Sequence, residues 1–153
     1  MALYLVQHGK NLSKDLDIHK GLSEEGSAEV KRIAEVARQY GIKVSTIFHS
    51  GKTRARQTAR IYASSLNIKN EIEETEGMKP LDDVVKFAQK IEVSENVMFV
   101  GHLPFLEKLT SYLVVGSGEK PIFKFQNGGI VCLDKEPDSQ SWIIKWTLMP
   151  NIG

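Results

Sequence analysis

Two histidines in this sequence each stand beside a glycine, directly after a short apolar run. His8 precedes Gly9 near the start of the chain, and His102 follows Gly101 in its second half. An imidazole with an unperturbed pKa of about 6.5 is largely neutral at pH 7 and can act as a nucleophile. The glycine beside it lets a ligand approach the backbone. Either histidine alone could simply be the residue that ends a strand, but the repeated arrangement indicates a site for chemistry.

Three cations, Lys52, Arg54 and Arg56, follow a further strand-like run at 44–49. The apolar spacing after them predicts a helix, so the cations stand at its N-terminal end. Positive charge is unfavourable there because that end of the helix dipole is itself positive, and a bound anion would compensate the cost. A solvated basic surface turn is the alternative interpretation of the same residues.

The chemistry that two histidines and an arginine suit is phosphoryl transfer. One imidazole can attack phosphorus, while the other imidazole and an arginine stabilise charge on the equatorial phosphoryl oxygens. The guanidinium fork matches a phosphate with two parallel hydrogen bonds, which a lysine cannot do. These groups share one site if their strands are parallel, because ligands of open α/β sheets bind beyond the carboxyl ends of the strands.

The elements that must position these residues alternate between strands and helices up to about residue 115. We expect strands at 3–6, 44–49, 70–74 and 96–100, and helices after the N-cap Ser23, at 52–66, from Pro80 and from Pro104. The later strand candidates are 122–125, 129–133 and 142–148, of which the last two form an antiparallel hairpin. This alternation predicts an α/β fold with a mostly parallel sheet covered by helices on both faces.

Composition narrows the function classes. The 153 residues are 41% hydrophobic and 25% charged with a net charge of +1, which argues against partners such as nucleic acid or an anionic membrane surface. The single cysteine, Cys132, excludes an internal disulfide and fits a reducing compartment. The sequence has no apolar run of about 18 residues and no signal-peptide core. We therefore expect a cytoplasmic protein whose residues 1–153 form a single domain.

Four motifs in order resemble those of the histidine phosphatase superfamily, which has the phosphoglycerate mutase-like fold. They are Gln7-His8-Gly9, Leu22-Ser23-Glu24-Glu25-Gly26, Ser50 with Arg54-Ala55-Arg56-Gln57-Thr58-Ala59, and Gly101-His102-Leu103-Pro104. The resemblance runs from Leu3 to about Asn127 and implies a three-layer sandwich. The short chain, without an inserted helical cap, is similar to the SixA-type phosphohistidine phosphatases.

The resemblance implies a role for each matching residue. His8 would be the nucleophile that becomes phosphorylated, and Arg54 and His102 would complete the catalytic group. Gly9 and Gly101 would border the substrate phosphate. The family mechanism needs neither a metal nor another cofactor, and the sequence contains no HExxH motif or Cys/His cluster.

Gln7 departs from the family pattern, which has arginine at this position. An amide donates hydrogen bonds to phosphate but carries no charge, so the substrate-binding site loses one cation unless another residue supplies it. Lys20, in the loop before the Leu22-Ser23 motif, is our candidate for that cation; the alternative is an ordinary loop lysine. The departure leaves open weak activity, or phosphate binding without turnover.

Other polar residues have less defined roles. Asp82 and Asp83 lie near the position of the general acid in larger family members, but they fit better as caps of the helix expected from Pro80. His19 and His49 match no family motif. Asn127 is a candidate for a polar contact to phosphate.

The resemblance and the missing cap together predict a metal-independent phosphatase for protein phosphohistidine, with a phosphorelay domain as one kind of partner. An imidazole leaving group can depart already protonated, so it needs an acid less than an alkyl phosphate does. Phosphate and other oxyanions should bind at the same site. The alternatives are a phosphatase for small phosphomonoesters and a catalytically weak module that binds phosphate or phosphohistidine.

Overall fold

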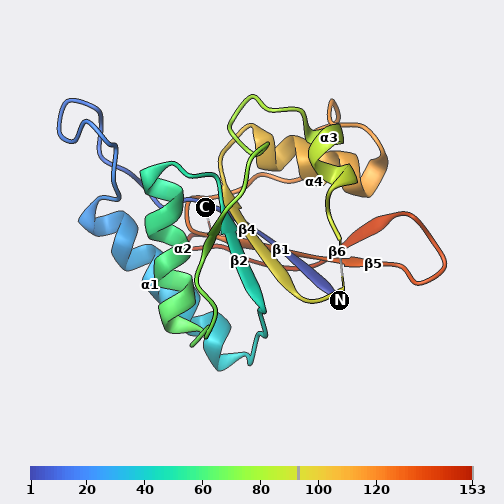
Figure 1. Cartoon of the computed structure of the whole chain (residues 1–153), viewed down its shortest axis with the longest axis horizontal. Helices are drawn as coiled ribbons and strands as arrows, with labels where there is room; N and C mark the ends of the chain where they lie inside the picture. The colour runs from blue at the N-terminus through green and yellow to red at the C-terminus, as the bar shows by residue number, and fades with distance from the viewer. Residues whose placement is uncertain (93, 153) are drawn as a thin grey trace.

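A six-stranded mixed sheet runs through the protein in a computed structural model that describes residues 1–92 and 94–152 (Figure 1). The strands are β1 (Ala2–Gln7), β2 (Thr46–His49), β3 (Glu73–Glu74), β4 (Val97–Gly101), β5 (Ile130–Lys135) and β6 (Trp142–Leu148), in the order β3-β2-β4-β1-β5-β6. The first four are parallel, whereas β5 is antiparallel to β1 and β6 is antiparallel to β5. The predicted parallel sheet and terminal hairpin are therefore confirmed.

Helices cover both faces of the sheet and make the expected three layers. They are α1 (Glu24–Gln39), α2 (Thr53–Ser65), α3 (Val84–Gln89) and α4 (Phe105–Val115). The buried side chains of β1 alternate: Leu3 and Leu5 pack in a cluster with α3 and α4, while Tyr4 and Val6 pack with α1 and α2. A strand buried on both faces reads as a continuous apolar run, which explains the pattern seen in the sequence.

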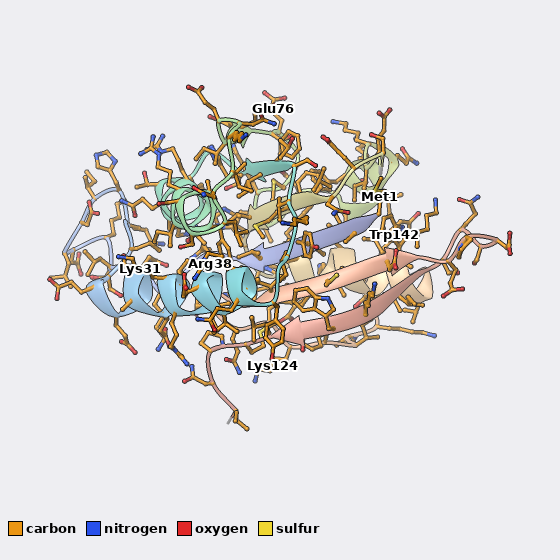
Figure 2. All side chains as sticks on the ribbon, turned by 90° about the horizontal axis from the view of Figure 1, so that it is seen from below. Met1, Lys31, Arg38, Glu76, Lys124 and Trp142 are labelled. Atoms are coloured by element: carbon orange, nitrogen blue, oxygen red, sulfur yellow. The ribbon has the colours of Figure 1, made fainter. Side chains whose placement is uncertain are left out.

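Helix α1 follows the sequence closely. The Ser23 hydroxyl accepts a hydrogen bond from the Gly26 N–H at 3.0 Å, which caps the helix. The expected inner face is buried and consists of Gly26, Val30, Ile33, Ala34 and Ala37. In Figure 2 the labelled Lys31 and Arg38 mark the exposed side of this helix. No helix within the described residues is both long and apolar enough to cross a membrane.

Gly26 brings α1 against the backbone that follows β1. A Cβ atom at this position would lie 2.0 Å from the Lys10 carbonyl oxygen, so only glycine permits the approach. Lys10 in turn accepts the Ser23 backbone N–H at 3.0 Å. The start of α1 therefore fixes the chain immediately after His8.

Three expected elements differ from the structure. The strand expected at 70–74 is reduced to the two residues of β3. Helix α3 begins at Val84 rather than at Pro80, because the Asp83 carboxylate caps it by accepting the N–H groups of Val85 and Lys86. Residues 122–125 pair with no strand in the described part of the chain. Phe125 is buried in the cluster with α3 and α4 instead, and its N–H donates to the Glu107 carboxylate.

Candidate active site

Parallel strands bring the two histidines together. His8 follows the last residue of β1, His102 follows β4, and these two strands are neighbours in the sheet. The His8 N–H donates to the Gly101 carbonyl at 2.9 Å. The two imidazole ring centroids lie 5.1 Å apart with the rings tilted by 50°. The structure thus places both histidines at one point on the carboxyl edge of the sheet.

The hydrogen bonds of His8 assign its tautomer. Its Nδ1 lies 2.7 Å from the Gly9 carbonyl oxygen, and a carbonyl oxygen only accepts, so Nδ1 carries the proton. Arg54 Nε donates to His8 Nε2 at 3.4 Å. The lone pair of Nε2 therefore points to the side on which the Arg54 guanidinium lies. A nucleophilic imidazole needs this arrangement, with an unprotonated nitrogen beside the cation that receives the phosphate.

Burial keeps both imidazoles uncharged. Desolvation lowers the pKa of His8 to about 4, although the hydrogen bond to the Gly9 carbonyl opposes this shift; the charges of Arg54 and Lys20 lower the pKa by smaller amounts. Desolvation also lowers the pKa of His102 to about 3, assisted by His8, Arg54 and Lys52. At pH 7 the His8 ring is therefore neutral, which is the state that a nucleophilic imidazole requires.

Ser50 contacts His102, a role that the sequence motif alone did not indicate. Its hydroxyl lies 2.5 Å from His102 Nε2, and both groups are buried. His102 Nδ1 is also buried and has no hydrogen-bond partner among the described residues. Ser50 follows β2 directly, so its position at a strand end was the signal that could have identified it.

The three cations expected at the start of α2 have different surroundings. Arg54 contacts His8, and Lys52, the N-cap residue, is close enough to lower the pKa of His102. Arg56 instead lowers the pKa of His49, whose largest shift comes from burial. Two of the three cations therefore act on the paired histidines.

Both glycines of the histidine motifs are closely packed. A Cβ at Gly9 would lie 2.7 Å from the Val30 side chain, whereas one at Gly101 would lie 2.8 Å from the flexible end of the Met78 side chain, which can move aside. The space beside each glycine is thus taken by an apolar side chain of the same protein. The expected role of Gly9 and Gly101 in binding substrate stays a prediction.

Gln7 precedes His8 in the chain, and Lys20 lies close enough to lower the pKa of His8. Gln7 is buried, and its Oε1 has no hydrogen-bond partner among the described residues. Lys20 belongs to a loop at 11–22 that is held by hydrogen bonds from Gly21 N–H to Asp17 and from Leu22 N–H to Gln57 of α2. Lys20 is the second cation after Arg54 that lowers the pKa of His8. This placement favours Lys20 over an ordinary loop lysine as the compensating cation.

The remaining candidates have structural partners. His19 is exposed, whereas the buried His49 accepts the Gly51 N–H at Nδ1 and thereby shapes the turn after β2. The Asn127 amide donates to the His8 carbonyl oxygen at 2.9 Å. Asp82 accepts the Lys79 N–H at 2.8 Å, and Asp83 caps α3, so both aspartates serve local structure.

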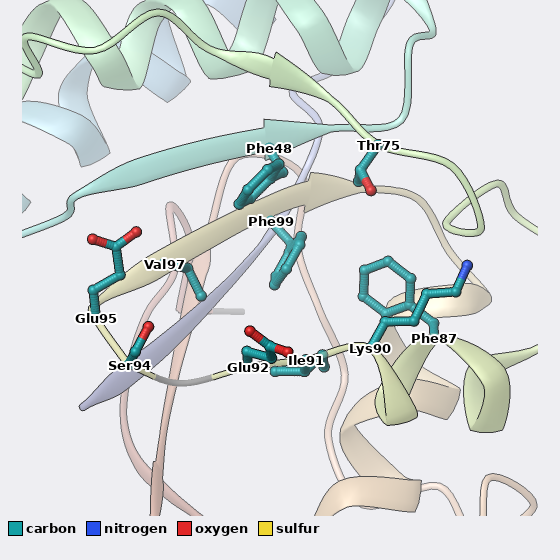
Figure 3. A pocket seen from close by; sticks show the side chains of 10 residues that line it. All are labelled: Phe48, Thr75, Phe87, Lys90, Ile91, Glu92, Ser94, Glu95, Val97 and Phe99. Atoms are coloured by element: carbon teal, nitrogen blue, oxygen red, sulfur yellow. The ribbon is translucent and has the colours of Figure 1, made fainter.

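Two hollows lie near this half of the sheet. One of about 560 Å³ extends from Ser50 along the segment before α3, and its lining includes Glu76, Lys79 and Leu81. The other, of about 290 Å³, lies over aromatic side chains such as Phe48 (Figure 3). Of these two hollows, only the larger is lined by a residue, Ser50, that contacts a candidate catalytic residue, His102. Within residues 1–92 and 94–152 no three His, Cys, Asp or Glu side chains gather as a metal site requires.

Comparison with known families agrees with the site. The family model for the histidine phosphatase superfamily (branch 1) matches residues 3–82, which is more than half of the chain. The protein belongs to the histidine phosphatase superfamily. No curated protein sequence matches this chain.

Solved structures with the same fold include SixA proteins. The protein histidine phosphatase SixA, solved with tungstate, is 23% identical, with 98% of this chain and 97% of that chain covered and a TM-score of 0.84. A candidate phosphohistidine phosphatase SixA from Agrobacterium tumefaciens is 29% identical, with 97% of each chain covered and a TM-score of 0.76. The α-ribazole phosphatase from Shigella flexneri is 15% identical, with 100% of this chain and 98% of that chain covered and a TM-score of 0.75.

The lowered pKa of His8 has a measurable consequence. We expect an NMR titration to place the pKa of the His8 imidazole near 4. Because this folded-state pKa lies below the unfolded value of about 6.5, the unfolded chain takes up protons first on acidification. The stabilising contribution is complete above pH of about 6.5 and is lost as the pH falls toward 4.

Urea unfolding at several pH values between 7 and 4 measures that loss. A His8→Gln variant, which carries no titrating group at this position, should lose less stability over the same interval. A His8 imidazole that titrates at its ordinary value in the folded protein would contradict the buried, uncharged state.

The second prediction concerns the missing family arginine. If Lys20 supplies the cation, Lys20→Gln should weaken inhibition by phosphate about tenfold or more, because a hydrogen bond to a charged group contributes about 1.5–3 kcal/mol. Gln7→Arg should then change inhibition little, and the two substitutions should be non-additive. Lys14→Gln, an exposed position in the same loop, is the matched control. Equal inhibition constants for Lys20→Gln and Lys14→Gln would show that Lys20 does not contact the anion.

Proposed function

We propose that this protein is a metal-independent phosphatase that hydrolyses protein phosphohistidine through a covalent phosphohistidine on His8. The observation that carries the proposal is the state of the His8 ring. Its proton is on Nδ1, toward Gly9, and its unprotonated Nε2 lies 3.4 Å from Arg54 Nε. Superfamily membership supports phosphatase chemistry in general, and this geometry supports His8 as the group that performs it.

In the proposed first step, His8 Nε2 attacks phosphorus and the phosphorus–nitrogen bond of the substrate breaks. The departing imidazole keeps the electron pair of that bond and leaves as a neutral ring, because its other ring nitrogen already carries a proton. In the second step, water attacks the phosphorus, the bond to His8 Nε2 breaks with its electron pair returning to that nitrogen, and the proton of the water goes to the phosphate product or to solvent. Arg54 and His102 stabilise the charge on the equatorial oxygens in both steps.

A protein substrate is supported by the shape of the region between α2 and β4. The described residues there contain only the two-residue strand β3 and the six-residue helix α3, so they form no inserted helical cap. A site without such a cap admits the surface of another protein. The structural likeness to SixA proteins supports the same choice, and a phosphorelay domain is the kind of partner that would present phosphohistidine.

Further residues bear on how the proposed enzyme binds its substrate and in which environment it works. Gln7 and Lys20 would bind the substrate phosphate, beside Gly9 and Gly101. The buried Cys132 is the single cysteine and supports a reducing cytoplasmic environment. We also infer that residues 1–153 act as one domain.

A small phosphomonoester is the second candidate substrate. The 560 Å³ hollow beside Ser50 has the size of an ordinary small-molecule site, and it mixes lysine and carboxylate side chains. A substrate bound there would place its phosphate toward His102 and its leaving group toward α3. Comparing turnover of a phosphohistidine protein with turnover of sugar phosphates separates the two candidates.

The deciding experiment incubates the protein with a phosphohistidine-bearing domain in the presence of EDTA and measures released phosphate. Wild-type protein should release it, and His8→Ala should be slower by about a hundredfold or more, which corresponds to roughly 2.7 kcal/mol in activation free energy. His19→Ala, an exposed histidine, should keep wild-type turnover. Retained activity in His8→Ala would exclude the covalent mechanism. Tight phosphate binding without turnover in the wild-type protein would instead identify a binding module.

A further inference from the structure

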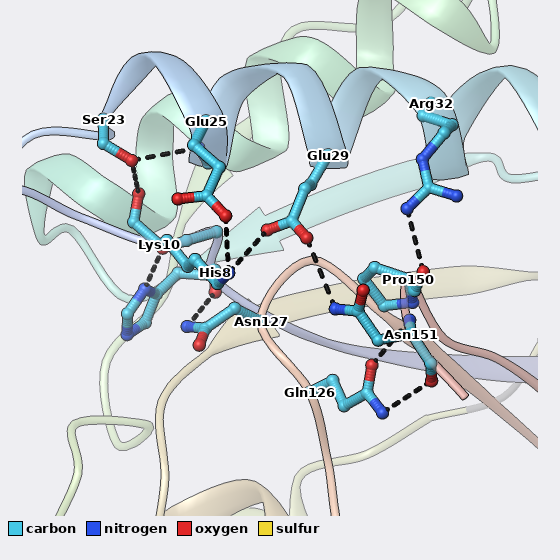
Figure 4. A network of polar contacts seen from close by, with 12 residues as sticks. His8, Lys10, Ser23, Glu25, Glu29, Arg32, Gln126, Asn127, Pro150 and Asn151 are labelled. Carbon is cyan, nitrogen blue, oxygen red and sulfur yellow. Dashed lines mark hydrogen bonds and ion pairs between the residues drawn. The ribbon is translucent and has the colours of Figure 1, made fainter. Parts of the chain in front are cut away.

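The peptide unit between His8 and Gly9 lies just beyond β1, where strand pairing no longer satisfies both of its polar groups. Its N–H, which belongs to Gly9, donates to the Thr58 hydroxyl at 2.9 Å. Its carbonyl, which belongs to His8, accepts from Asn127 Nδ2 at 2.9 Å (Figure 4). Two side chains from distant parts of the sequence thus hold the two ends of one peptide plane.

The orientation of this peptide plane determines the state of the His8 ring. The next carbonyl along the chain, that of Gly9, receives the His8 Nδ1 proton at 2.7 Å. A rotation of the His8–Gly9 peptide would move the Gly9 carbonyl away from Nδ1. The ring would then lose the contact that keeps its proton on Nδ1 and leaves Nε2 available for attack.

Asn127 is itself held by the segment that follows β6. The neighbouring Gln126 side chain makes two hydrogen bonds to the backbone of Asn151, at 2.8 Å to its carbonyl and 2.9 Å from its N–H. Arg32 of α1 donates to the Pro150 carbonyl at 2.8 Å, which ties the same segment to the helix. Figure 4 shows these contacts as one network that reaches from α1 to the His8 carbonyl.

The residue after Asn127 adds a second attachment to the strand. Gly128 N–H donates to the Gln7 carbonyl at 2.8 Å, and the Gly128 carbonyl accepts from the Tyr62 hydroxyl at 2.6 Å. Tyr62 is fully buried in α2. The loop at 126–128 is therefore fixed at both sides, with the Asn127 amide directed at His8.

We propose that Asn127 is a positioning residue for the nucleophile, and that the segment after β6 keeps it in place by binding Gln126. The inference rests on the proposed function only in that His8 is taken as the nucleophile. Asn127 acts through the His8–Gly9 peptide and not on the phosphate: one N–H of its Nδ2 donates to the His8 carbonyl, and phosphate inhibition of the Asn127→Ala variant tests whether the second N–H reaches the anion. The role differs from the phosphate contact that the sequence suggested for this residue.

The test measures the His8 tautomer and the reaction separately. In Asn127→Ala, ¹⁵N chemical shifts of the His8 ring should show the proton divided between Nδ1 and Nε2, whereas the wild-type ring should hold it on Nδ1. The kcat for phosphohistidine hydrolysis should fall about tenfold or more, because small displacements of a reacting group are costly. The inhibition constant of phosphate should change less than about twofold, because the proposal leaves the anion contacts intact.

Two matched pairs of variants test the proposal: Gln126→Ala is compared with Asn151→Ala, and Asn127→Ala with Asn70→Ala. Gln126→Ala should reproduce the effect in weaker form, but Asn151→Ala should not, because Gln126 binds the backbone of residue 151 and not its side chain. Asn70→Ala also loses a hydrogen bond from an amide to a carbonyl, that of Ser45, and should leave the His8 spectrum unchanged.

An unchanged His8 spectrum in Asn127→Ala would overturn the proposal. Weaker phosphate inhibition with an unchanged spectrum would overturn it as well, since Asn127 would then contact the anion directly. If the wild-type protein shows no turnover, the proposed function fails, but the spectra of the same variants still decide whether Asn127 positions the ring.

Discussion

The site depends on one constraint: an imidazole must stay uncharged and fixed in orientation at the end of a buried strand. Desolvation supplies the first requirement and lowers the pKa of His8 to about 4. The Gly9 carbonyl supplies the second by holding the Nδ1 proton. Both depend on the backbone just beyond β1, which α1 reaches through Gly26 and which α2 reaches through Thr58. The surrounding helices therefore position the ring as well as cover the sheet.

The cations around the two histidines serve two purposes at once. Arg54 and Lys20 carry the positive charge that the proposed phosphate site needs, and they also lower the pKa of His8 by their charge. Lys52 and Arg54 have the same effect on His102. In the proposed function, cations placed this way would not protonate the nucleophile at neutral pH. Because Gln7 is uncharged, the residue that precedes His8 in the chain adds no cation. The loop that carries Lys20 is anchored to α2 through Gln57.

Much of this arrangement follows from the sequence, and the exceptions have physical reasons. The face of α1 and the parallel strands β1, β2 and β4 were predictable because burial on one or both sides leaves a clear sequence pattern. Residues 122–125 were wrongly predicted to form a strand, because an apolar stretch gives the same sequence pattern whether it pairs in a sheet or packs on a helix. The start of α3 was predicted too early, because Pro80 and Asp83 are both residues that commonly begin a helix. The contact from Asn127 to His8 joins residues that only the folded chain brings together.

The central claim is that the Nε2 atom of His8 carries the phosphoryl group during turnover. The most direct measurement mixes the protein with a phosphohistidine-bearing domain, stops the reaction in base within the first turnover, and locates the phosphoryl group by mass spectrometry and ³¹P NMR. The account predicts a phosphoryl group on Nε2 of His8, the nitrogen that faces Arg54. Release of phosphate with no phosphorylated His8 at any time point, or a phosphoryl group on Nδ1, would contradict it.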